Sequence, residues 1–289
     1  MKKIKTVKYS KSDISKLLVY PEKRANKYSR GTCVVVAGSE KYPGAAILSS
    51  LAATKSGSGY TKLYTDKSNY KNIATAIPAI PTAPFSELKI IDTKDNKPCA
   101  YLIGPGFDPD EDNTSVVCKI LENTNAPVVI DGGAIASISS KKVRDLLEDR
   151  HNNNLITILT PHAGEGSKIL ENYACEDQVN LKEKAELLSE LTNSLVVLKD
   201  YISYVCDGNA IYEMNSGTSA LAKAGSGDVL AGILAGVLCQ NKRSAFEVCV
   251  LATNIHANAA KLATNELGEI SVTPPDLIEN LVKSIQLIA

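Results

Sequence analysis

The sequence predicts an α/β fold in which a mainly parallel central sheet is flanked by helices. Short apolar runs of the kind that form strands buried on both faces alternate with helix-like segments. Turns rich in glycine and proline follow the ends of several of these runs. Strands that are separated by helices at this spacing favour right-handed βαβ units, which build parallel sheets.

The first half of the chain opens with an apolar run at Cys33–Ala37, which ends at Gly38 and predicts a buried strand. Ala45–Lys55 has a helical composition and stops before Gly57, a residue typical of helix ends. A strand is expected next at Tyr60–Thr65. Further strands are expected at Tyr101–Ile103, Val128–Ile130, Ile156–Leu159 and Leu195–Leu198, with helices near 115–122, 141–148, 166–171 and 181–191.

The C-terminal third has a different pattern. Ser203–Cys206, the turn Asp207-Gly208-Asn209 and Ala210–Met214 predict a β-hairpin. Three helices are expected after it, at Asp228–Cys239, Ser244–Leu262 and Pro275–Ile288.

Length and composition are those of an ordinary globular protein and predict a single domain over residues 1–289. The chain is 44% hydrophobic and 22% charged, which is enough for a sizeable core. The proline-rich piece Ile77–Pro84 predicts an irregular connection, and its prolines are too closely spaced to mark a domain boundary. The formal net charge is zero, so neither a nucleic acid nor an acidic membrane is expected as a partner.

Two features indicate a cytoplasmic protein without a metal centre. The basic N-terminus lacks the apolar core of a secretory signal, and the apolar run Val229–Cys239 is too short to cross a bilayer. The seven cysteines include no CxxC pair and mostly have apolar neighbours, so buried free thiols are expected. Because the three histidines lie far apart in the sequence, no metal-ligating residues are assigned.

The segment Ala224-Gly225-Ser226-Gly227-Asp228 is the strongest functional motif. Small residues open a helix there and leave its first backbone N–H groups free at the positive end of the helix dipole, which suits the phosphates of a nucleotide. Two interpretations of Asp228 are open. It could take a proton from a substrate hydroxyl during phosphoryl transfer, or it could merely cap the helix.

Five punctuated turns fall just after strand ends, where open α/β sheets bind their ligands. They are Gly38-Ser39, Gly104-Pro105-Gly106, Asp131-Gly132-Gly133, Thr160-Pro161-His162 and Lys199-Asp200. Five such turns at one sheet edge predict a long ligand cleft, which favours the catalytic interpretation of Asp228.

These residues also carry a family resemblance. The segments in order are AGSEKYPGAAILSSLAATKSGSGY, LIGPGFD, VVIDGGAI, LTPHAGE, VVLKDYIS and AGSGDVLAGILAG. Together they resemble the NAD(P)H-hydrate dehydratases of the ribokinase-like superfamily, and they cover nearly the whole chain from about Gly31. The resemblance implies a ribokinase-like three-layer sandwich.

The resemblance also implies a metabolite-repair lyase (hydro-lyase) that uses ADP or ATP to dehydrate hydrated NADH or NADPH (NADHX, NADPHX) back to NADH or NADPH. ADP, the more common donor of stand-alone members, would yield AMP and phosphate, and Mg²⁺ would accompany the nucleotide. Stand-alone members are often homotetramers. Some relatives carry an N-terminal epimerase domain, which is not expected here because only about 30 residues precede the first motif.

Site residues follow from the resemblance, one motif at a time. Asp228 would be the general base and contact the substrate hydroxyl, and Gly225, Ser226 and Gly227 would form an anion hole through their backbone N–H groups. Substrate would also contact Ala45, Gly106 and His162, the last as a neutral imidazole. The nucleotide would contact Gly227 and the run Lys199, Asp200, Tyr201, Ile202 and Ser203.

Three positions depart from the family pattern. Asp108 stands where a third glycine is usual after GPG, Gly132-Gly133 lacks the second acid of a DAD-type motif, and Asp200 replaces the glycine of a KGA-type turn. The added carboxylates Asp108 and Asp200 should oppose an anionic ligand unless Mg²⁺ or a lysine compensates.

Two other functions stay open on the residues alone. A small-molecule kinase of the same superfamily, such as a vitamin-precursor kinase, would use Asp228 for the same chemistry on a stable alcohol. A non-catalytic nucleotide-binding protein would account for the three departures.

Overall fold

The computed structural model describes residues 4–90, 98–108, 111–175, 177, 179–240 and 243–289. Its centre is a ten-stranded sheet in the order β1-β10-β9-β8-β7-β6-β5-β2-β3-β4. The strands are β1 Lys5–Val7, β2 Thr32–Val36, β3 Tyr60–Thr65, β4 Thr82–Pro84, β5 Cys99–Ile103, β6 Val128–Ile130, β7 Thr157–Leu159, β8 Leu195–Leu198, β9 Ser203–Cys206 and β10 Ala210–Met214. The α-helices are α1 Lys11–Ser15, α2 Pro43–Lys55, α3 Tyr70–Ala76, α4 Glu111–Asn123, α5 Lys141–Asn152, α6 Ala163–Asn172, α7 Leu181–Thr192, α8 Ser226–Leu238, α9 Ala245–Leu267 and α10 Pro274–Ile288.

The sheet is mainly parallel, as expected. Every pairing from β8 through β7, β6, β5, β2 and β3 to β4 is parallel, and β1 pairs parallel with β10. Only β9 runs antiparallel to its neighbours, because β9 and β10 form the expected hairpin.

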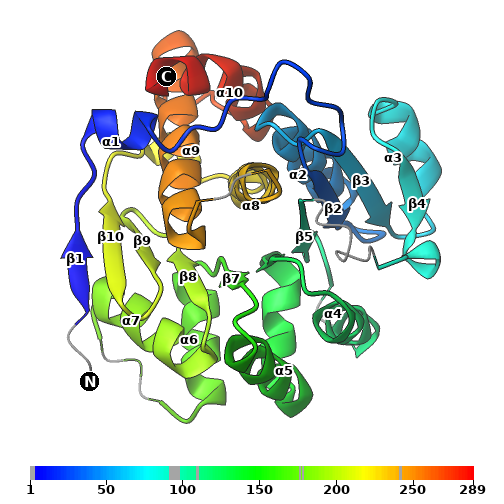
Figure 1. Cartoon of the computed structure of the whole chain (residues 1–289), viewed down its shortest axis with the longest axis vertical. Coiled ribbons are helices and arrows are strands. Elements are labelled where there is room, and N and C mark those ends of the chain that lie inside the picture. The colour runs from blue at the N-terminus through cyan, green and yellow to red at the C-terminus, as the bar shows by residue number, and fades with distance from the viewer. Residues whose placement is uncertain (1–3, 91–97, 109–110, 176, 178, 241–242) are drawn as a thin grey trace.

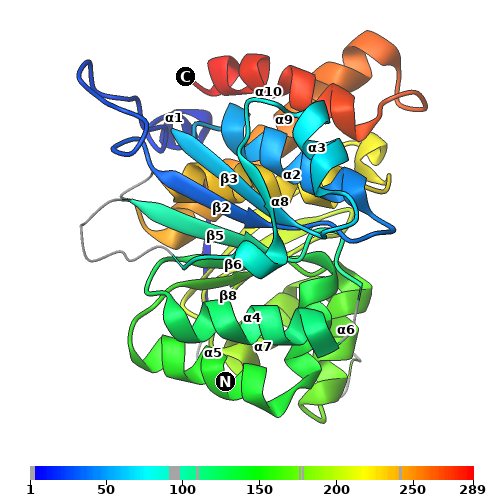
Figure 2. The same cartoon turned by 90° about the vertical axis from the view of Figure 1, so that its right-hand side faces the viewer.

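Helices cover both faces of the sheet and make three layers (Figures 1 and 2). Helices α2, α8, α9 and α10 lie on one face, and α4, α5, α6 and α7 lie on the other. Strand β2 shows how the two cores form: Cys33 and Val35 belong to the first, whereas Val34 and Val36 belong to the second. All five β2 residues are buried, which explains the continuous apolar run of this strand.

Most expected elements are confirmed to within a few residues, but helices α1 and α3 and two edge strands were not expected. Thr82–Pro84 forms the edge strand β4, whereas Ile77–Pro84 was expected to be an irregular connection. Proline is tolerated there because an edge strand leaves one row of N–H positions unpaired. The short strand β1 was not predicted, because three residues give no usable periodicity. Helix α8 begins at Ser226, two residues before the expected start at Asp228.

The structure also bears on the cysteines and on membrane-spanning helices. None of the seven cysteines forms a disulfide, and six of them are buried. In the described part of the chain, no helix combines the length and apolarity that a membrane span requires.

Candidate functional site

The five predicted turns lie side by side at one edge of the sheet. They follow β8, β7, β6, β5 and β2, which are consecutive neighbours. Backbone hydrogen bonds link them: the Lys199 N–H donates to the Pro161 carbonyl at 2.8 Å, and the Gly38 N–H donates to the Pro105 carbonyl at 2.7 Å. The topology therefore builds the continuous row of turns from which the sequence predicts a ligand cleft.

The start of α8 has the geometry of an anion site. Gly225 is the N-cap with φ of +95°, and a Cβ there would lie 2.9 Å from Leu48 Cδ1, so glycine is required. No side chain caps this helix, and Asp228 is its third residue. The Ser226 N–H donates to the Lys223 carbonyl at 3.1 Å. Among the described residues no acceptor is assigned to the Gly227 N–H, which leaves it available to a ligand.

Asp228 is half-buried at the first turn of α8 and faces two other charged groups. Burial raises the pKa of Asp228 to about 7, the Asp131 carboxylate adds to the rise, and the Lys199 ammonium opposes it. A general base works best when its pKa lies near the working pH. The capping role, the alternative left open for Asp228, has no hydrogen bond to support it here.

The half-buried Lys199 forms an ion pair with the buried Asp131 beside Asp228. Lys199 Nζ lies 2.6 Å from Asp131 Oδ1, and the Thr160 hydroxyl donates to the same oxygen at 2.6 Å. Burial by itself lowers the pKa of Lys199, but Asp131 and other nearby carboxylates outweigh it and leave this pKa raised. A Cβ at Gly227 would lie 3.2 Å from Lys199 Nζ, so the ammonium lies against the first turn of α8.

If Asp228 is the expected general base, its pKa gives a prediction for the pH profile of the reaction. The base must be ionised to accept a proton, so kcat/KM should rise with pH through an apparent pKa near 7 and then level off. The measurement is kcat/KM for the substrate between about pH 5 and 9 at saturating nucleotide. A rate that is already maximal near pH 5 would contradict this assignment.

Ala45 and Gly106, which come from different motifs, are brought into contact. Gly106 has φ of +69°, and a Cβ there would lie 2.7 Å from Ala45 Cβ and 2.8 Å from the Tyr42 carbonyl oxygen. Ala45 itself is 8% exposed. Two small residues at this point would let the flat ring of the expected substrate approach the backbone closely.

His162 and Glu165 form a capping box at the start of α6. His162 Nδ1 accepts from the Gly164 and Glu165 N–H groups at 3.0 and 3.3 Å, and the Glu165 carboxylate accepts from the His162 N–H at 2.8 Å. Because Nδ1 is an acceptor, the ring is neutral and its proton is on Nε2. The side chain is 62% exposed, so this N–H can reach a ligand. His162 thus has a structural role in addition to the expected binding role.

The structure accounts for two of the three departures from the family pattern. Lys41 Nζ lies 3.2 Å from Asp108 Oδ1, so a lysine compensates this added carboxylate. A Cβ at Gly133 would lie 2.1 Å from the Phe107 carbonyl oxygen, so no acidic side chain fits at this position. Asp200 is exposed and accepts from the Tyr201 N–H at 2.7 Å, without an ion pair among the described residues.

The close approach of the Phe107 carbonyl makes Gly133 a position where a substitution should destabilise the fold. Gly133→Ala should destabilise the fold by about 1–3 kcal/mol, because the backbone carbonyl of Phe107 has to move. The expected fall in Tm is roughly 3–8 °C. Gly44→Ala is the control, since its Cβ would meet no atom within 4 Å. Equal Tm values for the two variants would contradict the prediction.

Four residues complete the site without having been assigned to it from the sequence. Asp131 pairs with Lys199 and accepts a hydrogen bond from the Thr160 hydroxyl, and the burial of Glu165 raises its pKa. His256 Nε2 lies 3.4 Å from the Ser226 hydroxyl, and burial lowers the pKa of His256 to about 4. The Ser226 side chain therefore faces the core. Asp131 and Glu165 lie inside the family motifs VVIDGGAI and LTPHAGE, so the sequence did contain a signal for these two residues.

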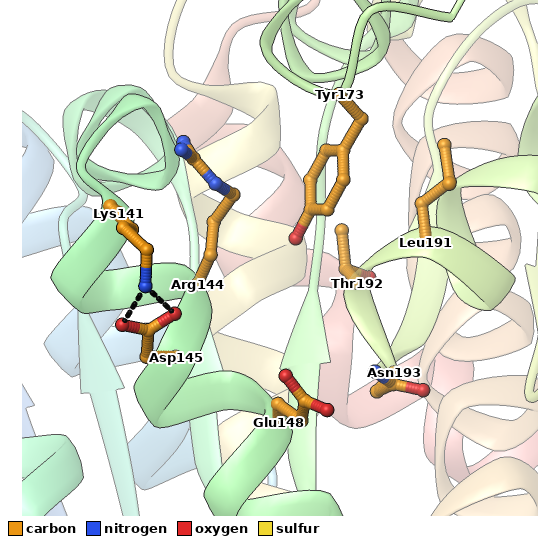
Figure 3. Close-up of a pocket in the computed structure, with 8 residues that line it drawn as sticks. All are labelled: Lys141, Arg144, Asp145, Glu148, Tyr173, Leu191, Thr192 and Asn193. Atoms are coloured by element: carbon orange, nitrogen blue, oxygen red, sulfur yellow. Dashed lines mark hydrogen bonds and ion pairs between the residues drawn. The ribbon is translucent and has the colours of Figure 1, made fainter.

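Two surface cavities are present in the helical layer that contains α5, α6 and α7. One, of about 230 Å³, lies between α6 and the 3-10 segment Gly132–Ser139 and includes His162 and Lys168 in its lining. The other, of about 260 Å³, lies between α5 and the end of α7 (Figure 3). There Lys141 is paired with Asp145, and Arg144 extends beside Tyr173. None of the predicted site residues lines this second cavity.

Within the described ranges, no three His, Cys, Asp or Glu side chains converge in a way that could hold a metal ion.

Comparison with known proteins agrees with this geometry. A family model described as NAD(P)H-hydrate dehydratase matches residues 33–283, which include all five turns and the start of α8. The chain belongs to the NAD(P)H-hydrate dehydratase family. An ADP-dependent (S)-NAD(P)H-hydrate dehydratase of Cenarchaeum symbiosum is 28% identical, with 93% of each chain covered. The chain spans about half the length of several curated relatives it matches, which are bifunctional NAD(P)H-hydrate repair enzymes.

Solved structures show that the fold is that of this family. The ADP/ATP-dependent NAD(P)H-hydrate dehydratase of Bacillus subtilis, co-crystallised with ATP/Mg²⁺, has a TM-score of 0.80 at 22% identity, with 100% of each chain covered. A ribokinase-like superfamily protein of Enterococcus faecalis has a TM-score of 0.78 at 23% identity, covering 99% of this chain and 96% of that one. The three-layer sandwich expected from the sequence is therefore a ribokinase-like fold.

Proposed function

We propose that this protein dehydrates hydrated NADH and NADPH to NADH and NADPH with ADP as phosphoryl donor, releasing AMP and phosphate. The observation that carries the proposal is the half-buried Asp228, whose pKa is about 7, beside Lys199 at the uncapped start of α8. The name of the Cenarchaeum symbiosum relative, which is ADP-dependent, supports the choice of donor.

The proposed reaction has two stages. Asp228 takes the proton of the hydroxyl on the hydrated ring, the hydroxyl oxygen bonds to the terminal phosphorus of ADP, and the bond from that phosphorus to AMP breaks. The ring C–O bond then breaks as phosphate leaves. Loss of a proton from the neighbouring ring carbon restores the double bond of the reduced nicotinamide.

The other residues position the reactants. Lys199 and the N–H groups of Gly225–Gly227 stabilise charge on the transferring phosphoryl group; among the described residues, no acceptor is assigned to the Gly225 and Gly227 N–H groups. Residues Lys199–Ser203 contact the nucleotide. Ala45 and Gly106 let the flat ring approach, and the His162 Nε2–H donates to the substrate.

We propose that Mg²⁺ enters with the nucleotide. Mg²⁺ commonly keeps several waters and binds through one or two carboxylates together with substrate phosphates, so a closed protein cage is not needed. Asp131 is held by Lys199 and Thr160, and Asp200 is exposed within the nucleotide-binding run Lys199–Ser203. The phosphates would hold the ion, which would neutralise part of their charge.

The test is an assay with purified protein, hydrated NADH or NADPH, Mg²⁺, and ADP or ATP in separate reactions. The expected result is a nucleotide-dependent gain in the absorbance of the reduced nicotinamide ring, with AMP as product of the ADP reaction. Phosphorylation of a thiazole or pyrimidine alcohol without this gain would favour the kinase alternative. Nucleotide binding without turnover of any of these substrates would favour a non-catalytic protein.

Two further parts of the proposal concern the protein in the cell. We propose a cytoplasmic homotetramer, on the family resemblance. Light scattering on the purified protein measures the number of subunits, and fractionation of cells that express it measures the compartment.

A further inference from the structure

The cavity between α6 and Gly132–Ser139 has the make-up of a small ligand pocket. Its volume is about 230 Å³. Ile135 and Ile169, which are 3% and 1% exposed, contribute apolar wall, while His162 and Lys168 lie among its polar residues. Pockets of this kind, mostly apolar with a few polar groups, are typical binding sites.

Two polar side chains of this pocket are not used by the protein. Lys168 and Asn172 lie one helical turn apart on α6, both exposed, and no described residue is assigned as a hydrogen-bond or ion-pair partner to either side chain. Glu165 also lines the pocket, but its carboxylate is held by the His162 N–H at 2.8 Å. The pocket therefore has one free ammonium group, at Lys168, and a free amide beside it.

The position of the pocket relates it to the proposed substrate site. Ala45 and Gly106 lie after β2 and β5, whereas Gly132-Gly133 and His162 lie after β6 and β7, the next two strands along the same edge. A dinucleotide whose ring lay at Ala45 and Gly106 and whose chain passed His162 would extend its distal half along this edge toward the pocket. That half carries phosphate groups, for which a lysine is a suitable partner.

We propose that this pocket receives the adenosine half of the hydrated dinucleotide and that Lys168 pairs with one of its phosphates. This inference rests on the proposed function. The phosphate is either the pyrophosphate, present in both NADH and NADPH forms, or the 2′-phosphate of the NADPH form. Lys168 is then a residue that sets substrate affinity, and in the second case it also sets the preference between the two substrates.

The test is Lys168→Gln, with Lys261→Gln as control, because Lys261 is an exposed helical lysine for which no interaction is assigned. At saturating ADP, Lys168→Gln should raise KM roughly tenfold for one or both hydrated substrates, with kcat and the KM for ADP unchanged. A rise for both substrates identifies the pyrophosphate, and a rise for hydrated NADPH alone identifies the 2′-phosphate. Unchanged KM values for both substrates would overturn the inference.

A second measurement separates this inference from the proposed function. Binding of NADPH, the product, is measured by its fluorescence with saturating AMP in the nucleotide site, so no turnover is needed. Lys168→Gln should weaken NADPH binding roughly tenfold, and the difference should shrink as the salt concentration rises. If wild-type protein binds NADPH without dehydrating its hydrate, the proposed function fails while Lys168 is still tested. Equal NADPH affinity of both proteins would again overturn the inference.

Discussion

Asp228→Asn is expected to lower kcat by at least about a hundredfold, because the amide cannot accept the substrate proton. The variant keeps the size of the side chain and the backbone of α8, so nucleotide binding should be retained. The measurement is kcat at saturating ADP and hydrated NADPH, together with the affinity for ADP. A variant with wild-type kcat would show that Asp228 is not the base.

The same variant has a stability signature that checks the environment of the carboxylate. Since the pKa of Asp228 in the folded protein is about 7, above its ordinary value of 3.8, the protonated form is favoured by folding. That contribution is fully present below the unfolded pKa and is lost as pH rises through about 7. Asp228→Asn should therefore have a higher Tm than wild type above pH 7, and the gain should shrink as pH falls. A Tm difference that does not change with pH would contradict this environment.

Lys199→Met should have the second largest effect, on activity and on stability together. It removes the ammonium that is proposed to lie beside the nucleotide phosphates, which should lower kcat/KM by on the order of a hundredfold. It also leaves the Asp131 carboxylate, 2% exposed, without its partner, which should cost about 3–5 kcal/mol of folding free energy. Because Lys199 lowers the pKa of Asp228, the acidic limb of the pH profile should move to higher pH.

A double variant separates these two effects. Lys199→Met with Asp131→Asn removes the unpaired charge, so it should regain most of the lost Tm and almost none of the lost activity. Thermal unfolding and steady-state kinetics on the same preparations make the comparison. If activity returned along with stability, Lys199 would be a purely structural residue.

Local patterns were enough to predict most of the fold. The continuous apolar run of β2 and the turns after β8, β7, β6, β5 and β2 predicted a parallel sheet with a row of turns at one edge, which is the arrangement observed. That this edge binds a ligand stays a prediction. The edge strands were harder to predict from the sequence. Strand β4 consists of Thr82–Pro84 inside a proline-rich segment, and its pairing with Leu63 in β3 is a long-range contact that no local pattern contains.

The same limit explains what was missed at the site. Lys199 and Asp131 are 68 positions apart, and only the sheet order brings their strand ends close enough for a 2.6 Å ion pair. The sequence shows only that Gly133 replaces an acidic residue of the family motif. The structure adds the reason, because a side chain at Gly133 would clash with the carbonyl of Phe107 on another loop. The role of Asp228 was argued from the helix start and the row of turns as well as from the family motifs, whereas those of Ala45, Gly106 and His162 came from the motifs alone. All four roles stay predictions.

The capping box of His162 has a consequence for ligand affinity. Two backbone N–H groups already hold the imidazole, so its rotamer is chosen when the chain folds and not when a ligand arrives. Ordering a free side chain on association typically costs about 0.5–1.5 kcal/mol, and this ring avoids much of that loss. The helix start that positions His162 thereby makes the donor at Nε2 a preorganised one.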